Sequence, residues 1–450
     1  MLIYITNGKH KSIDVHGIYE DNIPLLVFNI SQIKNYYYRG HRLHIIDQFD
    51  NSSEKKFLYK FKVTESLSLY DIETYTKLGI DISDNEDIID IASKEGNIDF
   101  LNWWINNEVK LKYSQKSLDN ASNYGKIEVL NWWLNCNLPL KYSATSTNFS
   151  SNILLENDVR LKILNWWYNS GLQMIYDDNT MDNASRNNKE EVLNWWLDSG
   201  LEIKYSEKAI DDACMFGYIN ILNWWYKSGL ELKYSEIAID YASIHGHIHI
   251  LEWWINSDLP LKYSNSSIDL LMDSYFLEEI HHLKILDWWK NSGLKIKYTK
   301  KSLDDASGSG NIEVLNWWKN SGLELKYSKY AIINAPNVDT LQWWVNSELK
   351  LKYDNKAIDW CIDTEKLNWW LKSGLPLYYT ESNIDKAFNN NRDDVLQLWI
   401  DSGLEIKHSI HSTWPKSNTA YPTKTIKWWE KSGLSKDYLS SIIKIDYRVL

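Results

Sequence analysis

The sequence has 450 residues, 44% hydrophobic and 24% charged, a composition that excludes wholesale disorder. Its formal net charge of -11, from 60 acidic and 49 basic residues, repels phosphate backbones, so we expect no nucleic-acid partner. The three cysteines lack the spacing of a disulfide framework or a metal site, and no apolar run approaches the roughly 18 residues of a membrane span. We therefore expect a cytoplasmic protein without membrane association, cofactor or metal.

Residues 1–80 differ in texture from the rest of the chain. β-Branched and aromatic residues cluster at 25–28 and 57–63, which predicts a small β-rich or α+β domain. The most polar-aromatic stretch, residues 36–42, is explained equally well by contact with a ligand and by exposed decoration of a strand. An enzymatic activity is left open only in this domain.

Residues 81–434 contain an internal repeat marked by tryptophan. The chain has 25 Trp, most of them in adjacent pairs, and the commonest step between pairs is 29 residues. The first residue of each pair, or of its variant, is Trp103, Trp132, Trp166, Trp195, Trp224, Trp253, Trp288, Trp317, Trp343, Trp369, Leu398 or Trp428. This period predicts about 12 stacked helix-turn-helix units, that is, an all-α repeat solenoid. Residues 435–450 are expected to form a cap or tail.

The stretch 206–234 shows the chemistry of one unit. Ser206 has the side chain of a helix N-cap, residues 209–215 predict a short first helix, and Gly217 can end it. Residues 219–226 carry apolar side chains at helical spacing and predict a second helix. The alternating segment 230–234 that follows predicts an extended connector.

The connector has a constant length. From the second Trp of a pair to the Tyr of the connector is always nine residues, whereas the distance from that Tyr to the next pair varies. Residues 143–165 and 264–287 are expanded, and residues 328–342 and 354–368 are contracted. We therefore expect the first helix and its following turn to tolerate changes in length.

The unit resembles the ankyrin repeat. Residues 238–259 read AIDYASIHGHIHILEWWINSDL, with Gly246 and His247 at the family's Gly-His position and the Trp pair on its leucine pair. The four residues missing from the family period of 33 fall in the hairpin loop. Such Trp-rich arrays are similar to those of giant DNA viruses of amoebae, as is the preceding stretch 68–79. The resemblance implies protein binding through a concave surface, in the host cytoplasm if the chain is viral.

Aspartate occupies the family's helix-opening His position. The residues are Asp90, Asp119, Asp182, Asp211, Asp240, Asp269, Asp304, Asp359 and Asp385. One carboxylate per repeat lacks convergent partners, so we interpret these residues as structural, accepting backbone N–H bonds near a helix start.

The constant aromatic residues are interpreted as core. Helical register places the Trp pairs in the stacking core, and we expect the connector Tyr to stack repeat upon repeat. The alternative, a platform for bases or sugars, is disfavoured by that register.

Specificity for a partner is expected where the repeats vary, on the first helix and its following turn, which line the concave side in ankyrin arrays. Large side chains at these positions are the candidate partner-binding residues: Tyr124, Met215, Phe216, Tyr241, Ile244 and His245. Packing against an irregular neighbouring repeat explains them as well.

No catalytic or metal-ligating constellation emerges. His245, His247 and His249 alternate along a turn and a helix start, where we expect their side chains to diverge. The sequence thus predicts a non-enzymatic protein-interaction scaffold that is monomeric alone and binds an unidentified protein. The alternative is a structural or self-associating viral protein.

Overall fold

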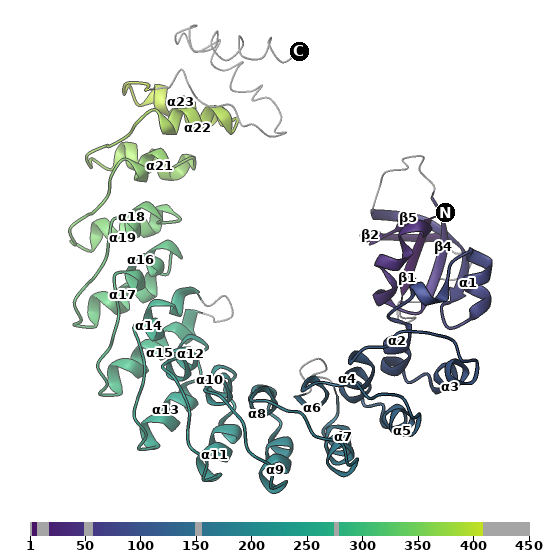
Figure 1. The fold of residues 1–450 in the computed structure, drawn as a ribbon. Helices are drawn as coiled ribbons and strands as arrows, with labels where there is room; N and C mark the ends of the chain where they lie inside the picture. The colour runs from purple at the N-terminus through teal and green to yellow at the C-terminus, as the bar shows by residue number, and fades with distance from the viewer. Residues whose placement is uncertain (1, 7–17, 49–56, 149–154, 274–278, 408–450) are drawn as a thin grey trace. The chain divides into compact units, whose positions relative to one another are not determined.

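The computed structural model describes residues 2–6, 18–48, 57–148, 155–273 and 279–407. It is an all-α repeat solenoid with a small antiparallel sheet near its amino terminus (Figure 1). The chain forms two compact units: unit 1 comprises residues 1–213 and 218–234, and unit 2 comprises residues 214–217 and 235–450. The boundaries of residues 1–80 and 81–434 stay predictions. The expected cap at 435–450 lies outside the described residues.

Five strands form the sheet, in the order β2-β5-β4-β1-β3. They are β1 (Leu2–Thr6), β2 (Ile18–Leu26), β3 (Phe28–Asn29), β4 (Arg42–Gln48) and β5 (Phe57–Ser68). Tyr4, Val27, Ile46 and Val63 form a buried cluster beside it. With α1 (Ile72–Leu78) following the last strand, the predicted β-rich or α+β character of this region is confirmed.

One of our two interpretations of residues 36–42 was that they are exposed decoration of a strand. That interpretation is wrong. Most of this stretch lies between β3 and β4, in and beside the 3-10 helix η2 (Tyr37–Arg39), which follows η1 (Ile30–Asn35). Tyr37 is buried, and the ring of Tyr36 stacks on Phe28 with centroids 4.0 Å apart. Tyr38 is instead 64% exposed, so the aromatic side chains of this stretch are divided between the interior and the surface.

The sheet region contacts the first repeat through aromatic rings. Tyr70 stacks on His41, with ring centroids 4.8 Å apart, and packs at 4.9 Å against Phe100 in α3 (Ile98–Asn106). The Tyr75 hydroxyl donates to the Leu69 carbonyl at 2.9 Å. These contacts cover the beginning of the array within unit 1.

Each repeat contributes two helices to two parallel rows. The first helices are α2 (Ile88–Glu95), α4 (Lys116–Asn123), α6 (Thr145–Asn148), α8 (Asn179–Arg186), α10 (Lys208–Met215), α12 (Ile237–Ile244), α14 (Ser266–Asp269), α16 (Lys301–Gly308), α18 (Tyr330–Ile333), α20 (Lys356–Asp359) and α22 (Ser382–Asn389). The second helices are α3 (Ile98–Asn106), α5 (Ile127–Asn135), α7 (Asn157–Asn169), α9 (Glu190–Asp198), α11 (Ile219–Lys227), α13 (Ile248–Asn256), α15 (Glu279–Asn291), α17 (Ile312–Asn320), α19 (Val338–Asn346), α21 (Thr364–Lys372) and α23 (Asp393–Asp401). Two further 3-10 helices are η3 (Ile82–Asp84) and η4 (Leu271–Asp273). The repeat around Trp428 lies outside the described residues.

The predicted place of variation is confirmed. In the four irregular repeats the first helix, α6, α14, α18 or α20, has four residues instead of the eight found in α2, α4 and α8. The helix that we expected from residue 209 begins at Lys208 and ends at Met215. Gly217 follows it with φ +73°, a backbone conformation that glycine adopts without strain.

The two tryptophans of a pair have different roles, which corrects the prediction that both are core. The second is fully buried, as Trp133 and Trp167 show, whereas the first, as in Trp132, is half-buried. Adjacent helical residues point about 100° apart, so both cannot face the core. The buried indole Nε1 of Trp167 donates at 2.9 Å to the Ser122 hydroxyl of the preceding repeat. The first Trp instead bonds an Asn on the preceding second helix.

The aspartates are structural, as predicted, but they bond the next repeat rather than their own helix start. In α4, Asp119 accepts from the Ser143 backbone N at 2.8 Å and from its hydroxyl at 2.6 Å. The Ser143 hydroxyl in turn accepts from the Thr145 backbone N at 3.2 Å. The Asp of one repeat thus fixes the start of the first helix in the next.

The connector tyrosine stacks between repeats, as predicted. Tyr205 packs against the second Trp of the following repeat, Trp225, with centroids 4.7 Å apart, and donates its hydroxyl to the Glu231 carbonyl at 2.6 Å. Lys233 of that next connector lies 4.3 Å from the centre of the Tyr205 ring. The same Lys-over-Tyr contact recurs at Lys141, Lys297, Lys326, Lys352 and Lys407.

Within the described part of the chain, no helix combines the length and the apolar character needed to cross a bilayer.

Removing one aspartate should destabilise the array locally. Asp119→Ala leaves the Ser143 backbone N–H without its acceptor, so we expect the free energy of unfolding to fall by about 1–3 kcal/mol. Asp198→Ala, at an exposed end of α9, is the matched control and should change it by about 0.5 kcal/mol or less. Urea denaturation followed by tryptophan fluorescence measures both. Equal losses for the two variants would contradict the structural role of Asp119.

Two aspartates should also respond oppositely to pH. Burial raises the pKa of Asp240, and hydrogen bonds from Ser264 only partly oppose it. Burial acts the same way on Asp269, but hydrogen bonds that include those from Ser302 and Thr299 outweigh it and lower its pKa. Asp269 therefore contributes stability that is present above its ordinary pKa of 3.8 and is lost as pH falls through its folded pKa. Asp240, with its raised folded pKa, favours the folded state increasingly as pH falls toward 3.8.

We expect the stability advantage of the natural chain over Asp269→Asn to shrink as pH falls below 3.8. Its stability relative to Asp240→Asn should instead rise as pH falls toward 3.8. Urea unfolding at a series of pH values tests the pair. Changes of the same sign in both comparisons would show that the hydrogen bonds do not set these pKa values.

Candidate functional site

The predicted partner-binding residues of unit 2 lie on neighbouring repeats. Phe216 is 37% exposed at the turn after α10, and Met215 is half-buried beside it. Tyr241, in the middle of α12, and His245, directly after its end, are half-buried, with ring centroids 6.0 Å apart. The first-helix turns therefore do bring most of these side chains to the surface.

Two of the six candidates behave differently. Ile244 is 8% exposed, so it offers almost no surface and takes the packing role that we had left open for it. Tyr124, in unit 1, is half-buried at the end of α4 and lies under the Lys94 ammonium, 4.8 Å from the ring centre. Tyr124 therefore belongs to a different unit from the other five candidates.

The histidines do not diverge, which corrects the expectation from their alternation. His245 and His247 are 6.2 Å apart between ring centroids, and His247 and His249 are 5.7 Å apart. The Nε2 atoms of His247 and His249 lie 3.0 Å from the carbonyl oxygens of Met215 and Gly217, to which they donate when protonated. The rings of His247 and His249, at the start of α13, lie close together because each forms a hydrogen bond with a carbonyl in the turn of the preceding repeat.

The surroundings of His245 and His247 favour the neutral form of both imidazoles. Burial lowers the pKa of His245 and, more than any other cause, that of His247. The two neighbouring histidines lower the pKa of His247 further, against the hydrogen bond to Met215. Among the described residues, no group of three or more His, Cys, Asp or Glu is placed to hold a metal ion.

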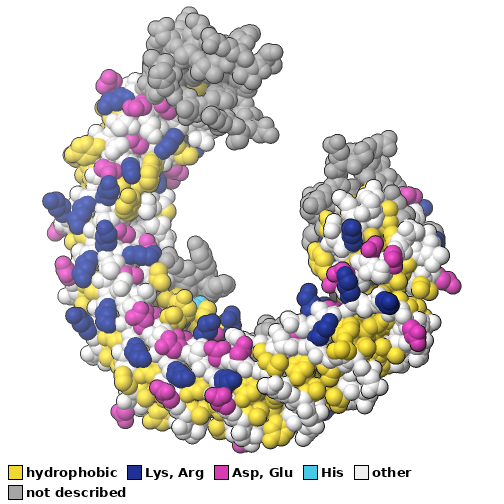
Figure 2. Space-filling view, in the orientation of Figure 1, with side chains coloured by type: hydrophobic (Ala, Val, Ile, Leu, Met, Phe, Trp, Pro, Cys, Tyr) yellow, Lys and Arg dark blue, Asp and Glu magenta, His cyan; other side chains and the backbone are white. Residues whose placement is uncertain are grey.

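A second surface, which our sequence analysis did not predict, runs along the second helices. The residue after the second Trp is exposed and apolar in successive repeats of unit 1: Leu134, Tyr168, Leu197 and Tyr226 are 37–51% exposed. The ring of Tyr168 meets the half-buried first Trp of the next repeat, Trp195, with centroids 5.9 Å apart. We call the side chains at these two positions in α5, α7, α9 and α11 the second-helix row. Hydrophobic side chains gather on the surface of unit 1 in Figure 2.

The same pair of positions lines a hollow in unit 2. A pocket of about 530 Å³ between α19 and α21 is lined by Val345, which follows a second Trp, and by Trp369, the first Trp of the next pair. The sequence did carry a signal for this surface, because the residue after the second Trp is apolar in most copies. Assigning the whole Trp pair to the core hides this signal, because the residue after the pair then has no predicted role at the surface.

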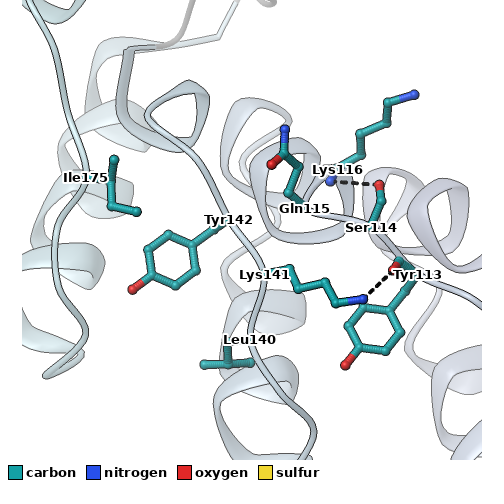
Figure 3. Close-up of a pocket in the computed structure, with 8 residues that line it drawn as sticks. All are labelled: Tyr113, Ser114, Gln115, Lys116, Leu140, Lys141, Tyr142 and Ile175. Atoms are coloured by element: carbon teal, nitrogen blue, oxygen red, sulfur yellow. Dashed lines mark hydrogen bonds between the residues drawn. The ribbon is translucent and has the colours of Figure 1, made fainter.

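A third feature of the surface is a groove across three connectors of unit 1 (Figure 3). It measures about 710 Å³ and is lined by Tyr113, Ser114, Gln115, Lys116, Leu140, Lys141, Tyr142 and Ile175. Gln115 and Lys116 stand at one side, Ile175 stands at the opposite side, and the middle connector lies between them. Lys141 is already engaged, since its Nζ donates to the Tyr113 carbonyl at 3.2 Å.

No protein-family model matches the chain. Over 119 residues, 23% of this chain, it is 37% identical to the uncharacterized protein L696 of Acanthamoeba polyphaga mimivirus. The matched segment spans 37% of the length of that relative.

Among solved structures, the maize pentatricopeptide repeat protein PPR10 in complex with an 18-nt psaJ RNA element is 12% identical. That likeness covers 83% of this chain and 60% of PPR10, with a TM-score of 0.41. The ankyrin repeat domain of human ASB11 is 13% identical and covers 58% of this chain and 98% of that domain, with a TM-score of 0.20. Likenesses of this size carry no functional argument, and the repeat fold rests on the helices and contacts described above.

Proposed function

We propose that the chain is a non-enzymatic scaffold that binds another protein through side chains left exposed by its repeats. The observation that carries this proposal is the second-helix row. The bonds between repeats engage the constant polar groups, whereas Leu134, Tyr168 and Leu197 remain exposed in successive repeats. Apolar side chains exposed in a continuous series are typical of interaction surfaces.

The charges beside the row indicate what kind of protein fits it. Asp99, Glu128 and Glu191 are exposed on α3, α5 and α9. Lys162 interrupts them on α7, where it pairs with Asp158 at 3.2 Å. A partner that presents apolar side chains flanked by basic ones complements this surface.

An ankyrin-like family membership and a role in a virus-infected amoeba are part of the same proposal. The repeat pattern at 238–259 and the mimivirus relative, matched over 119 residues, support them. The first-helix set of Met215, Phe216, Tyr241 and His245 is a second contact surface in this proposal.

Substitutions in the second-helix row should strongly lower the capture of a partner protein. We expect the combined change Leu134→Ser, Tyr168→Ser and Leu197→Ser to lower recovery of bound proteins from nuclease-treated amoebal lysate at least about tenfold, because each exposed apolar contact contributes of order 1 kcal/mol. The matched control changes the next residue in each helix: Asn135→Ser, Asn169→Ser and Asp198→Ser. Quantitative mass spectrometry of crosslinked complexes measures recovery.

Equal losses in the row variant and its control would overturn the row as the binding surface. Sedimentation of the natural chain at increasing concentration addresses the alternative of self-association. A monomer mass at every concentration supports the scaffold. A mass that rises with concentration, and that the row variant restores to the monomer, would favour self-association instead.

The first-helix surface has its own test. Met215→Ser with Phe216→Ser should lower capture in the same assay while leaving the urea unfolding midpoint nearly unchanged, since both side chains are at least partly exposed. Ile244→Ser should instead lower that midpoint, because Ile244 is 8% exposed and its apolar contacts are lost. Unchanged capture by the folded double variant would contradict a contact role for this turn.

A further inference from the structure

The connector groove of unit 1 has a counterpart two repeats further along. This second groove measures about 440 Å³ and is lined by Tyr176, Asp177, Asp178, Glu202, Ile203, Lys204, Tyr205 and Lys233. The first begins with Tyr113 and its following residues, and the second begins with Tyr176 and its following residues. The first groove takes three residues from its middle connector and the second takes four, and each takes one residue from the connector after it. They are therefore the same site in the repeat, carrying different side chains.

The charges that follow the first tyrosine differ between the two grooves. Where the first groove has Ser114 and Gln115 directly after its tyrosine, the second has Asp177 and Asp178. Lys116 lines the first groove and is exposed. The two grooves thus present opposite charge at their rims.

The remaining charged groups of the grooves are engaged by the array itself. Lys204 lies 3.7 Å from a carboxylate oxygen of Glu202 and 4.8 Å from the centre of the Tyr176 ring. Lys233 covers the ring of Tyr205, as Lys141 covers that of Tyr113. Asp177 accepts from the Asn179 backbone N at 3.1 Å. The exposed Lys116 and Asp178 are left as the principal charges offered to a partner.

An apolar step joins the two grooves. Ile175 lines the first groove and is 39% exposed, and the next residue along the chain, Tyr176, lines the second. A chain crossing from one groove to the other passes over these two side chains without leaving the connector surface.

We propose that an extended peptide segment of the partner protein lies across these connectors, with an acidic side chain at Lys116 and a basic side chain at Asp178. This inference rests on the proposed scaffold function and names the form of partner that this face accepts. Two repeats span about 20 Å at the usual helix packing distance, and an extended chain rises about 3.3 Å per residue. The acidic and basic side chains are therefore separated by about six residues. Apolar residues between them pack on Ile175.

Charge-matched peptides test the arrangement with the full-length chain. A fluorescein-labelled, Thr- and Val-rich peptide carries Glu and Lys about six residues apart, and its two control peptides carry Glu at both positions or Lys at both. At low ionic strength we expect the Glu-Lys peptide to bind at least about fivefold more tightly than either control, as measured by fluorescence anisotropy.

Two single substitutions test which groove binds the acidic side chain of the peptide and which binds the basic one. Lys116→Glu should remove the discrimination against the Lys-Lys peptide, and Asp178→Lys should remove that against the Glu-Glu peptide. Neither side chain makes one of the Asp-Ser or Trp-Ser bonds between repeats, and Lys116→Gln provides a milder variant if the glutamate perturbs Asp87. A preference that these variants leave unchanged would overturn the proposal, as would equal binding of the three peptides. Single-stranded RNA provides a further comparison. If it binds more tightly than the peptides and Lys116→Glu abolishes that binding, the groove accepts a nucleic acid instead of a peptide.

The two proposals fail separately. If none of the three peptides binds but capture of proteins still depends on the second-helix row, only the groove assignment is overturned. If capture is also independent of the row, the scaffold function is overturned with it.

Discussion

A buried indole that must find a hydrogen-bond acceptor determines how these repeats assemble. An indole N–H removed from water without a partner costs about 1–3 kcal/mol. Trp167 avoids that cost by donating to Ser122, and the Tyr142 ring packs at 4.9 Å against the same indole. Both partners belong to the preceding repeat. No such repeat can complete its own core, and stability arises between neighbours rather than within units.

This requirement explains why one part of the repeat has a constant length and another does not. Trp133 reaches back to Ser93, whereas the tyrosine nine residues later packs forward on the next buried indole. The connector joins these two contacts, so a change in its length would break one of them. The first helix can be short: α14 supplies its Asp with four residues that end at Asp269, and α6 and α18 have four residues and no Asp. Insertions and deletions are therefore absorbed there.

Periodicity predicted the repeat, the short first helices, the connector and the stacking tyrosine, because each of these repeats in register along one chain. Partners across repeats were harder to predict, since Asp119 and Ser143 are distant in sequence and only stacking brings them together. The pair Trp132 and Trp133 looked like one motif although helical geometry points its members apart. The histidines were misjudged for a similar reason: His247 and His249 are aligned by carbonyls of the preceding repeat. The grooves depend on three connectors at once, which no local pattern describes.

The aspartate bonds between repeats all have one polarity, with the serine or threonine of one unit donating to the aspartate of the unit before it. Such a heterologous contact pairs two different surfaces of the repeat, so it can be continued from one unit to the next. The described amino-terminal end departs from this pattern. Trp104 donates its indole N–H to the Val109 carbonyl of its own repeat at 2.8 Å, and Tyr70 covers Phe100. The amino-terminal sheet region thus takes the place of a preceding repeat, and it gives the array a defined first unit.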